Sequence, residues 1–135
     1  MAKTISDVID IEGISPENLF KLLTDSKKIS EITGFETKIS TKEGDELSAL
    51  NGGVFGRNLF IKPGRMIVQS WRRITWKKDW LDAILILSLT EKENGTRIDM
   101  TNANLPETEL QFIDWNTYWN PVREYMMKKA QKAGV

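Results

Sequence analysis

Few side chains in this sequence are suited to acid–base or nucleophilic chemistry. The 135 residues include no histidine and no cysteine, which removes the commonest general base near neutral pH and every thiol nucleophile. Among the carboxylates, Asp7 stands out because it shares one face of a predicted strand with Ile5 and Ile9. A carboxylate held among apolar side chains can serve as a general base. The structural alternative for Asp7 is a strand end or an ion pair with a cation.

Arg57 is the second polar candidate. It alternates in phase with Phe55 and Leu59 along a predicted strand over residues 54–61. An inward-facing guanidinium at this position could orient an anionic head group. The structural alternative is an ion pair or an exposed position on an edge strand. A metal site would have to be built from carboxylates, and no segment has the spacing of an EF-hand loop. We therefore predict no catalytic residue, no metal site and no cofactor.

The clearest apolar pattern lies in the C-terminal segment, residues 106–132, which predicts a helix of roughly six or seven turns. Its apolar positions repeat at spacings of three and four, which places them on one helix face. They are Phe112, Trp115, Trp119, Val122 and Met126. Pro121 lies inside this helix and is expected to kink it, because proline removes a backbone donor. One helix cannot bury two tryptophans alone, so the rest of the chain must pack around it.

The segments before this helix predict strands and two short helices. A strand over residues 4–12 comes first, Ser15 and Pro16 then begin a helix as N-cap and first helical residue, and a second short helix ends at Gly34. The further predicted strands cover residues 35–40, 47–50, 54–61, 66–76, 81–90 and 97–102. Strands joined by tight turns pair antiparallel. The prediction is an α+β fold over residues 1–135 as a single domain, with a curved sheet of six or seven strands around the long helix.

A curved sheet against one helix could enclose a pocket. The candidates for its walls are Trp71, Leu85 and Leu87 on the strands and Trp115, Trp119, Val122 and Met126 on the helix. Which face of strand 81–90 points inward stays open, because Ile84 and Ile86 are apolar as well. A filled core without a cavity is the alternative, since an aromatic stripe at helical spacing is more often core than ligand site.

Charge and hydropathy argue against nucleic acid and membrane partners. Nineteen basic residues balance nineteen acidic ones, so no overall field favours either. Residues 71–80 combine four cations with three tryptophans; base stacking is one interpretation, and we favour a hairpin whose cations lie over its aromatic rings. Residues 1–10 lack the apolar run of a signal peptide, and no apolar run is long enough to span a bilayer. We expect a soluble cytoplasmic protein.

Several segments taken in order resemble the family of activator of heat-shock protein 90 ATPase homologues, in its C-terminal-type domain. They are Ser15-Pro16-Glu17, Thr33-Gly34, residues 53–59, Pro63, residues 67–72, Leu105-Pro106, Asp114-Trp115, Tyr118-Trp119 and residues 121–125. The resemblance covers nearly the whole chain. It implies the START-like, helix-grip fold: an antiparallel sheet that grips a long C-terminal helix, with two small helices after the first strand.

The resemblance also bears on function, because proteins of the wider START-like group include lipid and hormone binders, cyclases and other enzymes. We expect a domain without catalytic activity that binds a small apolar or amphipathic molecule between sheet and helix. A chaperone-associated module is the first alternative, and residues 76–80 are its candidate surface. An enzyme of the cyclase or hydrolase type is the second, with Asp7 as the best available residue.

Overall fold

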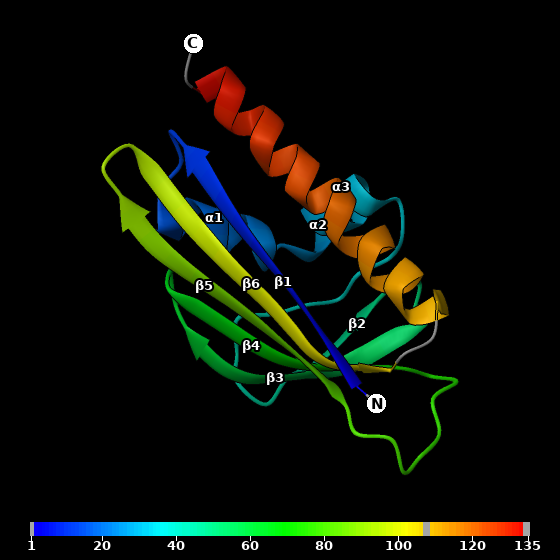
Figure 1. Ribbon diagram of the computed structural model, residues 1–135. Helices are drawn as coiled ribbons and strands as arrows, with labels where there is room; N and C mark the ends of the chain where they lie inside the picture. The colour runs from blue at the N-terminus through cyan, green and yellow to red at the C-terminus, as the bar shows by residue number, and fades with distance from the viewer. Residues whose placement is uncertain (1, 107–108, 134–135) are drawn as a thin grey trace.

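The computed structural model describes residues 2–106 and 109–133, with side chains placed for residues 3–106 and 116–129 (Figure 1). The elements in chain order are β1 (Ala2–Glu12), α1 (Pro16–Leu23), α2 (Ser26–Thr33), β2 (Glu46–Ala49), β3 (Val54–Lys62), β4 (Met66–Arg73), β5 (Ala83–Lys92), β6 (Gly95–Pro106) and α3 (Glu109–Ala133). The α+β, helix-grip arrangement expected from the sequence is confirmed.

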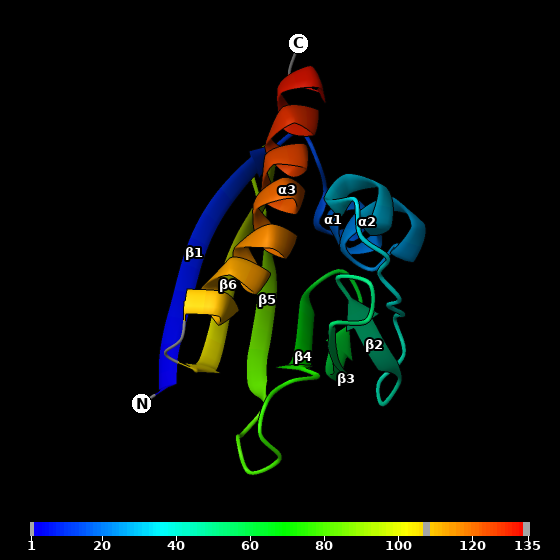
Figure 2. The ribbon, with the colours of Figure 1, turned by 90° about the vertical axis from the view of Figure 1, so that its right-hand side faces the viewer.

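The sheet has six strands in the order β1-β6-β5-β4-β3-β2, and every neighbouring pair is antiparallel. The first strand therefore pairs with the last one, β6, and the other neighbours are consecutive in the chain. The sheet curves around α3, which crosses its concave face in contact with β1 and β6, while α1 and α2 lie beside α3 (Figure 2).

Local capping signals place the two short helices as predicted. The Ser15 hydroxyl accepts a hydrogen bond from the backbone N–H of Asn18 at 3.2 Å, and Pro16 is the first helical residue of α1. The Asp25 carboxylate caps α2 in the same way. Gly34 ends α2 with φ +78°, a left-handed conformation that glycine adopts without steric cost.

The register of the strands decides which side chains face the helices. Leu85 on β5 lies opposite Gln69 on β4 and Asn102 on β6, and all three are at most 5% exposed. Ala83, Leu87 and Leu89 share this concave face because side chains alternate along a strand. Ile84 and Ile86 consequently point to the convex face. The structure thereby determines which face of strand β5 points toward the helices, a question that the sequence left open.

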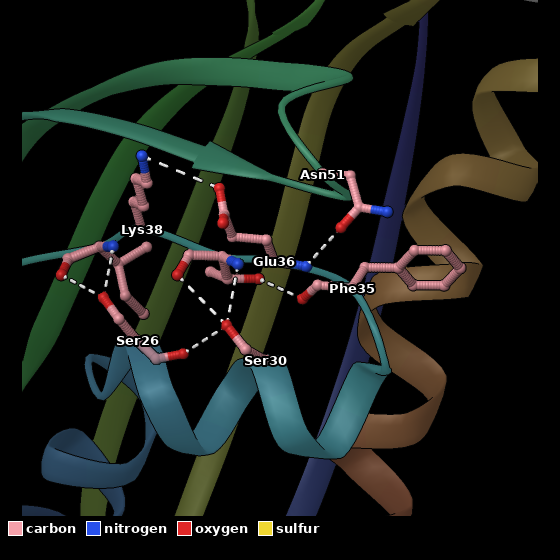
Figure 3. Close-up of polar contacts among 8 residues, drawn as sticks. Ser26, Ser30, Phe35, Glu36, Lys38 and Asn51 are labelled. Atoms are coloured by element: carbon pink, nitrogen blue, oxygen red, sulfur yellow. Dashed lines mark hydrogen bonds and ion pairs between the residues drawn. The ribbon is translucent and has the colours of Figure 1, made fainter.

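Residues 35–40 do not form the predicted strand; they carry a single bridge, between Lys38 and Ser48. Side chains of α2 bind this segment instead (Figure 3). The Ser26 hydroxyl accepts from the Ile39 N–H and donates to its carbonyl, both at 2.8 Å. The Ser30 hydroxyl accepts from the N–H of Thr37 at 2.9 Å. The backbone of this segment is therefore bound along α2 and does not add a seventh strand to the sheet.

Other strand boundaries also differ from the prediction by a few residues. β4 ends at Arg73 where the sequence pattern suggested Trp76, and β6 extends to Pro106. α3 continues through Pro121 as one helix. None of the described helices is long and apolar enough to cross a membrane.

Candidate ligand site between the sheet and the C-terminal helix

The apolar side chains predicted to line a pocket gather between the sheet and α3. Trp71, Leu85 and Leu87 lie on the concave face, and Trp119, Val122 and Met126 face them from α3; all six belong to one buried cluster with exposures of 0–5%. Trp115 lies on α3 one turn before Trp119, and its side chain is outside the described residues. Within the described part of α3, the helix stripe thus packs as its periodicity predicted.

Tyr118 belongs to the same buried cluster, although it lies off the predicted stripe. Its ring contacts Trp71 edge to face, with 4.9 Å between the ring centroids. Aromatic pairs favour this geometry, which brings the positive edge of one ring to the negative face of the other. Burial raises the pKa of the Tyr118 hydroxyl above its ordinary value, so the phenol is neutral at physiological pH. The spacing of apolar residues in the sequence does not indicate that Tyr118, which directly precedes Trp119, is buried.

Asp7 faces α3, as its phase with Ile9 predicted. Its Oδ2 accepts hydrogen bonds from Arg123 Nε at 2.9 Å and from Trp119 Nε1 at 3.2 Å. The Asp7 side chain is 28% exposed and that of Arg123 is 41% exposed. Asp7 is therefore held in an ion pair at the border of the site, and the enzyme alternative loses its best candidate base.

Arg57 does not point toward α3. It lies opposite Ser70 in the β3–β4 register, and this position places its side chain on the convex face. Its guanidinium donates to Glu46 Oε1 at 2.9 Å and to the Gly44 carbonyl at 3.0 Å. The inward side chain at this level of β3 is instead the neighbouring Asn58. The apparent phase of Arg57 with apolar residues arises because Phe55 and Leu59 are themselves exposed.

A row of polar side chains that the sequence did not reveal crosses the concave face. Asn58 on β3 and Gln69 on β4 are opposite each other and are 1% and 5% exposed. Gln69 Nε2 donates to Asn58 Oδ1 at 3.0 Å, and Gln69 Oε1 accepts from Trp71 Nε1 at 2.9 Å. Asn58 Nδ2 donates to the carbonyls of Ser40 and Lys42, both at 3.0 Å. These bonds satisfy the buried amides of Asn58 and Gln69.

Asn102 completes the row on β6 and differs from Asn58 and Gln69 in its hydrogen bonding. Asn102 is 1% exposed and is separated from Gln69 by Leu85 in the strand register. Its Oδ1 has no hydrogen-bond partner among the residues that the structure describes. Buried side-chain oxygens nearly always have a protein or water partner. Asn102 Oδ1 is therefore an acceptor for which a water molecule or a bound molecule could supply the partner.

The loop between β4 and β5, residues 74–82, carries the second notable group of side chains. Ile74 is 64% exposed and Leu81 is 75% exposed. The rings of Trp76 and Trp80 lie 6.2 Å apart, and the guanidinium of Arg72 lies 5.9 Å from the Trp76 ring centroid. The cation–ring packing expected for this segment is present.

Arg72 also holds this loop in place. It forms an ion pair with Asp82 at 2.6 Å and donates to the carbonyls of Lys77 and Trp80. The exposed Ile74 and Leu81 are thus presented on a loop with a defined shape. No group of three or more potential ligands in the described part of the chain is arranged to hold a metal ion.

Comparison with known proteins identifies the relatives of this fold and sequence. The family model described as "Activator of Hsp90 ATPase homolog 1-like protein" matches residues 14–126. The activator of 90 kDa heat shock protein ATPase homolog of Dictyostelium discoideum is 24% identical over 97 residues, which are 72% of this chain and 25% of that protein. The human activator homolog 1 is 24% identical over 107 residues, which are 78% of this chain and 31% of that protein.

A solved structure supports the same relationship at the level of the fold. The crystal structure of an HSP90 activator from Plasmodium falciparum matches with a TM-score of 0.75 at 21% identity, covering 92% of this chain and 91% of that one. The chain spans only 25% and 31% of the two curated relatives, so the activity of those whole proteins does not transfer with the match. Because the family model matches most of its length, the chain belongs to the family of activator of Hsp90 ATPase homolog 1-like proteins.

Proposed function

We propose that this domain binds a small, largely apolar molecule that carries a hydrogen-bond donor, in the space between the concave face of the sheet and α3. The observation that carries this proposal is the amide oxygen of Asn102, which is buried and has no partner among the described residues. Leaving such an oxygen unpaired costs about 1–3 kcal/mol. A ligand hydroxyl or N–H would supply the missing hydrogen bond.

The surrounding side chains suit a mostly apolar ligand. The walls that we propose for the ligand are six residues of the buried core cluster: Trp71, Leu85, Leu87, Trp119, Val122 and Met126. We include Trp115 as a further wall residue because it precedes Trp119 by one helical turn. Small-molecule sites typically combine apolar and aromatic walls with a few polar groups that orient the ligand. Asn102 would supply the orienting group, and the Asp7–Arg123 pair would mark the polar border of the site.

Binding of a matched pair of probes tests this proposal. 2-Naphthol has a hydroxyl donor, and 2-methoxynaphthalene has nearly the same shape without one. Because one buried hydrogen bond contributes about 1 kcal/mol, isothermal titration calorimetry should show about fivefold tighter binding of 2-naphthol. Native mass spectrometry of the purified protein should also detect a co-purified small molecule. Failure of both probes to bind, with no co-purified molecule, would eliminate this function.

A second candidate function is docking to a heat-shock protein 90 type chaperone. Family membership and the names of the relatives favour it. The observation within the chain is the exposed apolar pair Ile74 and Leu81, on the loop held by Arg72. Exposed apolar side chains on a stiff loop suit protein contact, because little conformational entropy is lost on binding. We place either function in the cytoplasm, since the absence of cysteine fits a reducing compartment.

The double variant Ile74→Ser with Leu81→Ser tests this second candidate. Surface substitutions of this kind change stability by at most about 0.5 kcal/mol, so a loss of chaperone capture would report on contact. Val8→Ser is a matched control, because Val8 is 51% exposed on the distant strand β1. Capture of the host chaperone should fall at least about tenfold in the double variant only. A wild-type protein that neither captures the chaperone nor alters its ATPase rate would exclude this role.

A further inference from the structure

A pocket of about 400 Å³ lies outside the site beneath α3, where α1, α2 and the C-terminal part of α3 come together. The three helices lie side by side in Figure 2. The pocket is lined from the loop before α1, from α1 and α2, and from Lys129 on α3. None of these lining residues belongs to the wall around Trp119, so the pocket is a separate site.

The floor of this pocket is apolar. Ile14 and Leu22 are each 8% exposed and Leu19 is fully buried, and all three line the pocket. Its volume falls within the roughly 300–1,000 Å³ that small-molecule sites usually have. The floor therefore provides a surface on which an alkyl chain or an aromatic ring can lie.

Three lysines surround this floor, one from each helix: Lys21 on α1, Lys28 on α2 and Lys129 on α3. None of them forms an ion pair within the part of the chain that the structure describes. Asp25 is the one carboxylate in the lining. Its Oδ1 accepts from the backbone N–H of Lys28 at 3.1 Å as the N-cap of α2, where the helix dipole offsets its charge. The lining therefore has an excess of positive charge.

Lys28 is held in place on the α3 side of the pocket. Its Nζ lies 5.2 Å from the centroid of the Tyr125 ring, a cation–ring distance at which the two groups attract each other. The neighbouring Tyr125 side chain raises the pKa of Lys28 above its ordinary value, so the ammonium group is charged at physiological pH. A fixed cation loses less conformational entropy on binding an anion than a mobile one.

We propose that this pocket binds a small amphipathic anion, with a phosphate or carboxylate head held by Lys21, Lys28 and Lys129 and an apolar tail on Ile14 and Leu22, with Leu19 buried beneath them. Lysine ammonium groups bind such heads as point charges. The lysines give this pocket a local positive charge, although the total charge of the chain is zero. It is independent of the ligand proposed beneath α3.

Octyl phosphate is the probe for this site, and 1-octanol is its uncharged counterpart. Calorimetry should show binding of octyl phosphate, much weaker binding of octanol, and a loss of affinity when NaCl is raised, since salt screens exposed charges. Exposed ion pairs contribute about 0.2–1 kcal/mol each. The double variant Lys28→Gln with Lys129→Gln should therefore bind octyl phosphate about tenfold more weakly. Lys28→Arg should retain most of the affinity.

Lys62→Gln is the matched control, because Lys62 is exposed at the end of β3 and does not line this pocket. Vesicles of phosphatidylcholine with and without phosphatidylserine identify the source of the anion: lysine-dependent vesicle binding would point to a lipid head group, and its absence to a free metabolite. Equal binding of octyl phosphate to the wild type and the double variant would overturn the proposal. Equal affinity for octanol, or no binding of octyl phosphate, would do the same.

Discussion

Replacing Asn102 with leucine is expected to stabilise the protein, although asparagine at this position is almost fully buried. Its Oδ1 has no partner among the described residues, and an unpaired buried amide oxygen costs about 1–3 kcal/mol. Leucine has the same branching and the same number of side-chain heavy atoms and no polar atom to satisfy, but its methyl groups are larger than the amide, and this overpacking costs about 1 kcal/mol. The free energy of unfolding of Asn102→Leu should therefore rise by about 1 kcal/mol.

Asn58→Leu is the matched control with the opposite expected sign. Asn58 is also 1% exposed on the concave face. Its amide donates to the carbonyls of Ser40 and Lys42 and accepts from Gln69. Leucine at this position leaves those three groups without their partner, so the free energy of unfolding should fall by about 3 kcal/mol. The same residue type thus has opposite effects at two positions on one face.

Urea denaturation followed by tryptophan fluorescence measures both effects. The midpoints should move in opposite directions while the m-value stays constant, which shows that the compactness of the folded state is unchanged. The Asn102→Leu variant should also lose the preference for 2-naphthol over 2-methoxynaphthalene. Destabilisation of Asn102→Leu comparable to that of Asn58→Leu would refute the reasoning, because it would show that Asn102 is already satisfied in the folded protein.

Three further substitutions test other contacts. Asp7→Asn removes the charge that pairs with Arg123 and should lower the free energy of unfolding by about 1 kcal/mol in urea denaturation; an unchanged midpoint would show that the pair contributes nothing. Gly56→Ala should lower it by about 3 kcal/mol, because a methyl group there would overlap the backbone carbonyl of Ser70; a thermal midpoint equal to wild type would contradict the packing of β3 on β4. Burial raises the pKa of Tyr118 above the ordinary value of 10.0 that it has in the unfolded chain. The free energy of unfolding is therefore unaffected below about pH 10 and falls as the pH rises further, because the unfolded state ionises first. The stability of Tyr118→Phe should accordingly decline less than that of wild type above pH 10, and parallel declines would exclude this effect.

Local patterns predicted most of the elements because their signals depend on neighbouring residues. Ser15 and Pro16 begin α1 and Gly34 ends α2, as capping preferences require. Spacings of three and four predicted the buried face of α3 around Trp119. The segment 35–40 was predicted wrongly as a strand, because hydroxyl groups of α2 bind its backbone. No signal within the segment itself reveals that competition.

The candidate site was predictable only in its apolar half. Periodicity identified Val122 and Met126, and strand phase placed Asp7 toward the helix. The partner of Asp7 is Arg123, which lies 116 residues further along the chain, and no local pattern connects two such positions. For Arg57 the sequence left two alternatives open, and the structure shows the ion pair, with Glu46; the apolar residues with which it alternates, Phe55 and Leu59, are themselves exposed.

The sequence by itself determined the order of the elements, the long amphipathic helix and the absence of histidine and cysteine chemistry. These properties follow from composition and from the fixed geometry of helices and strands. Only the tertiary structure decided that Asn58 has its hydrogen-bond partners and that Asn102 Oδ1 has none among the residues that the structure describes. The register between strands brings Gln69 opposite Asn58 and the apolar Leu85 opposite Asn102. Register arises from the packing of the whole sheet against the helices, so the environment of an inward amide cannot be read from its own strand.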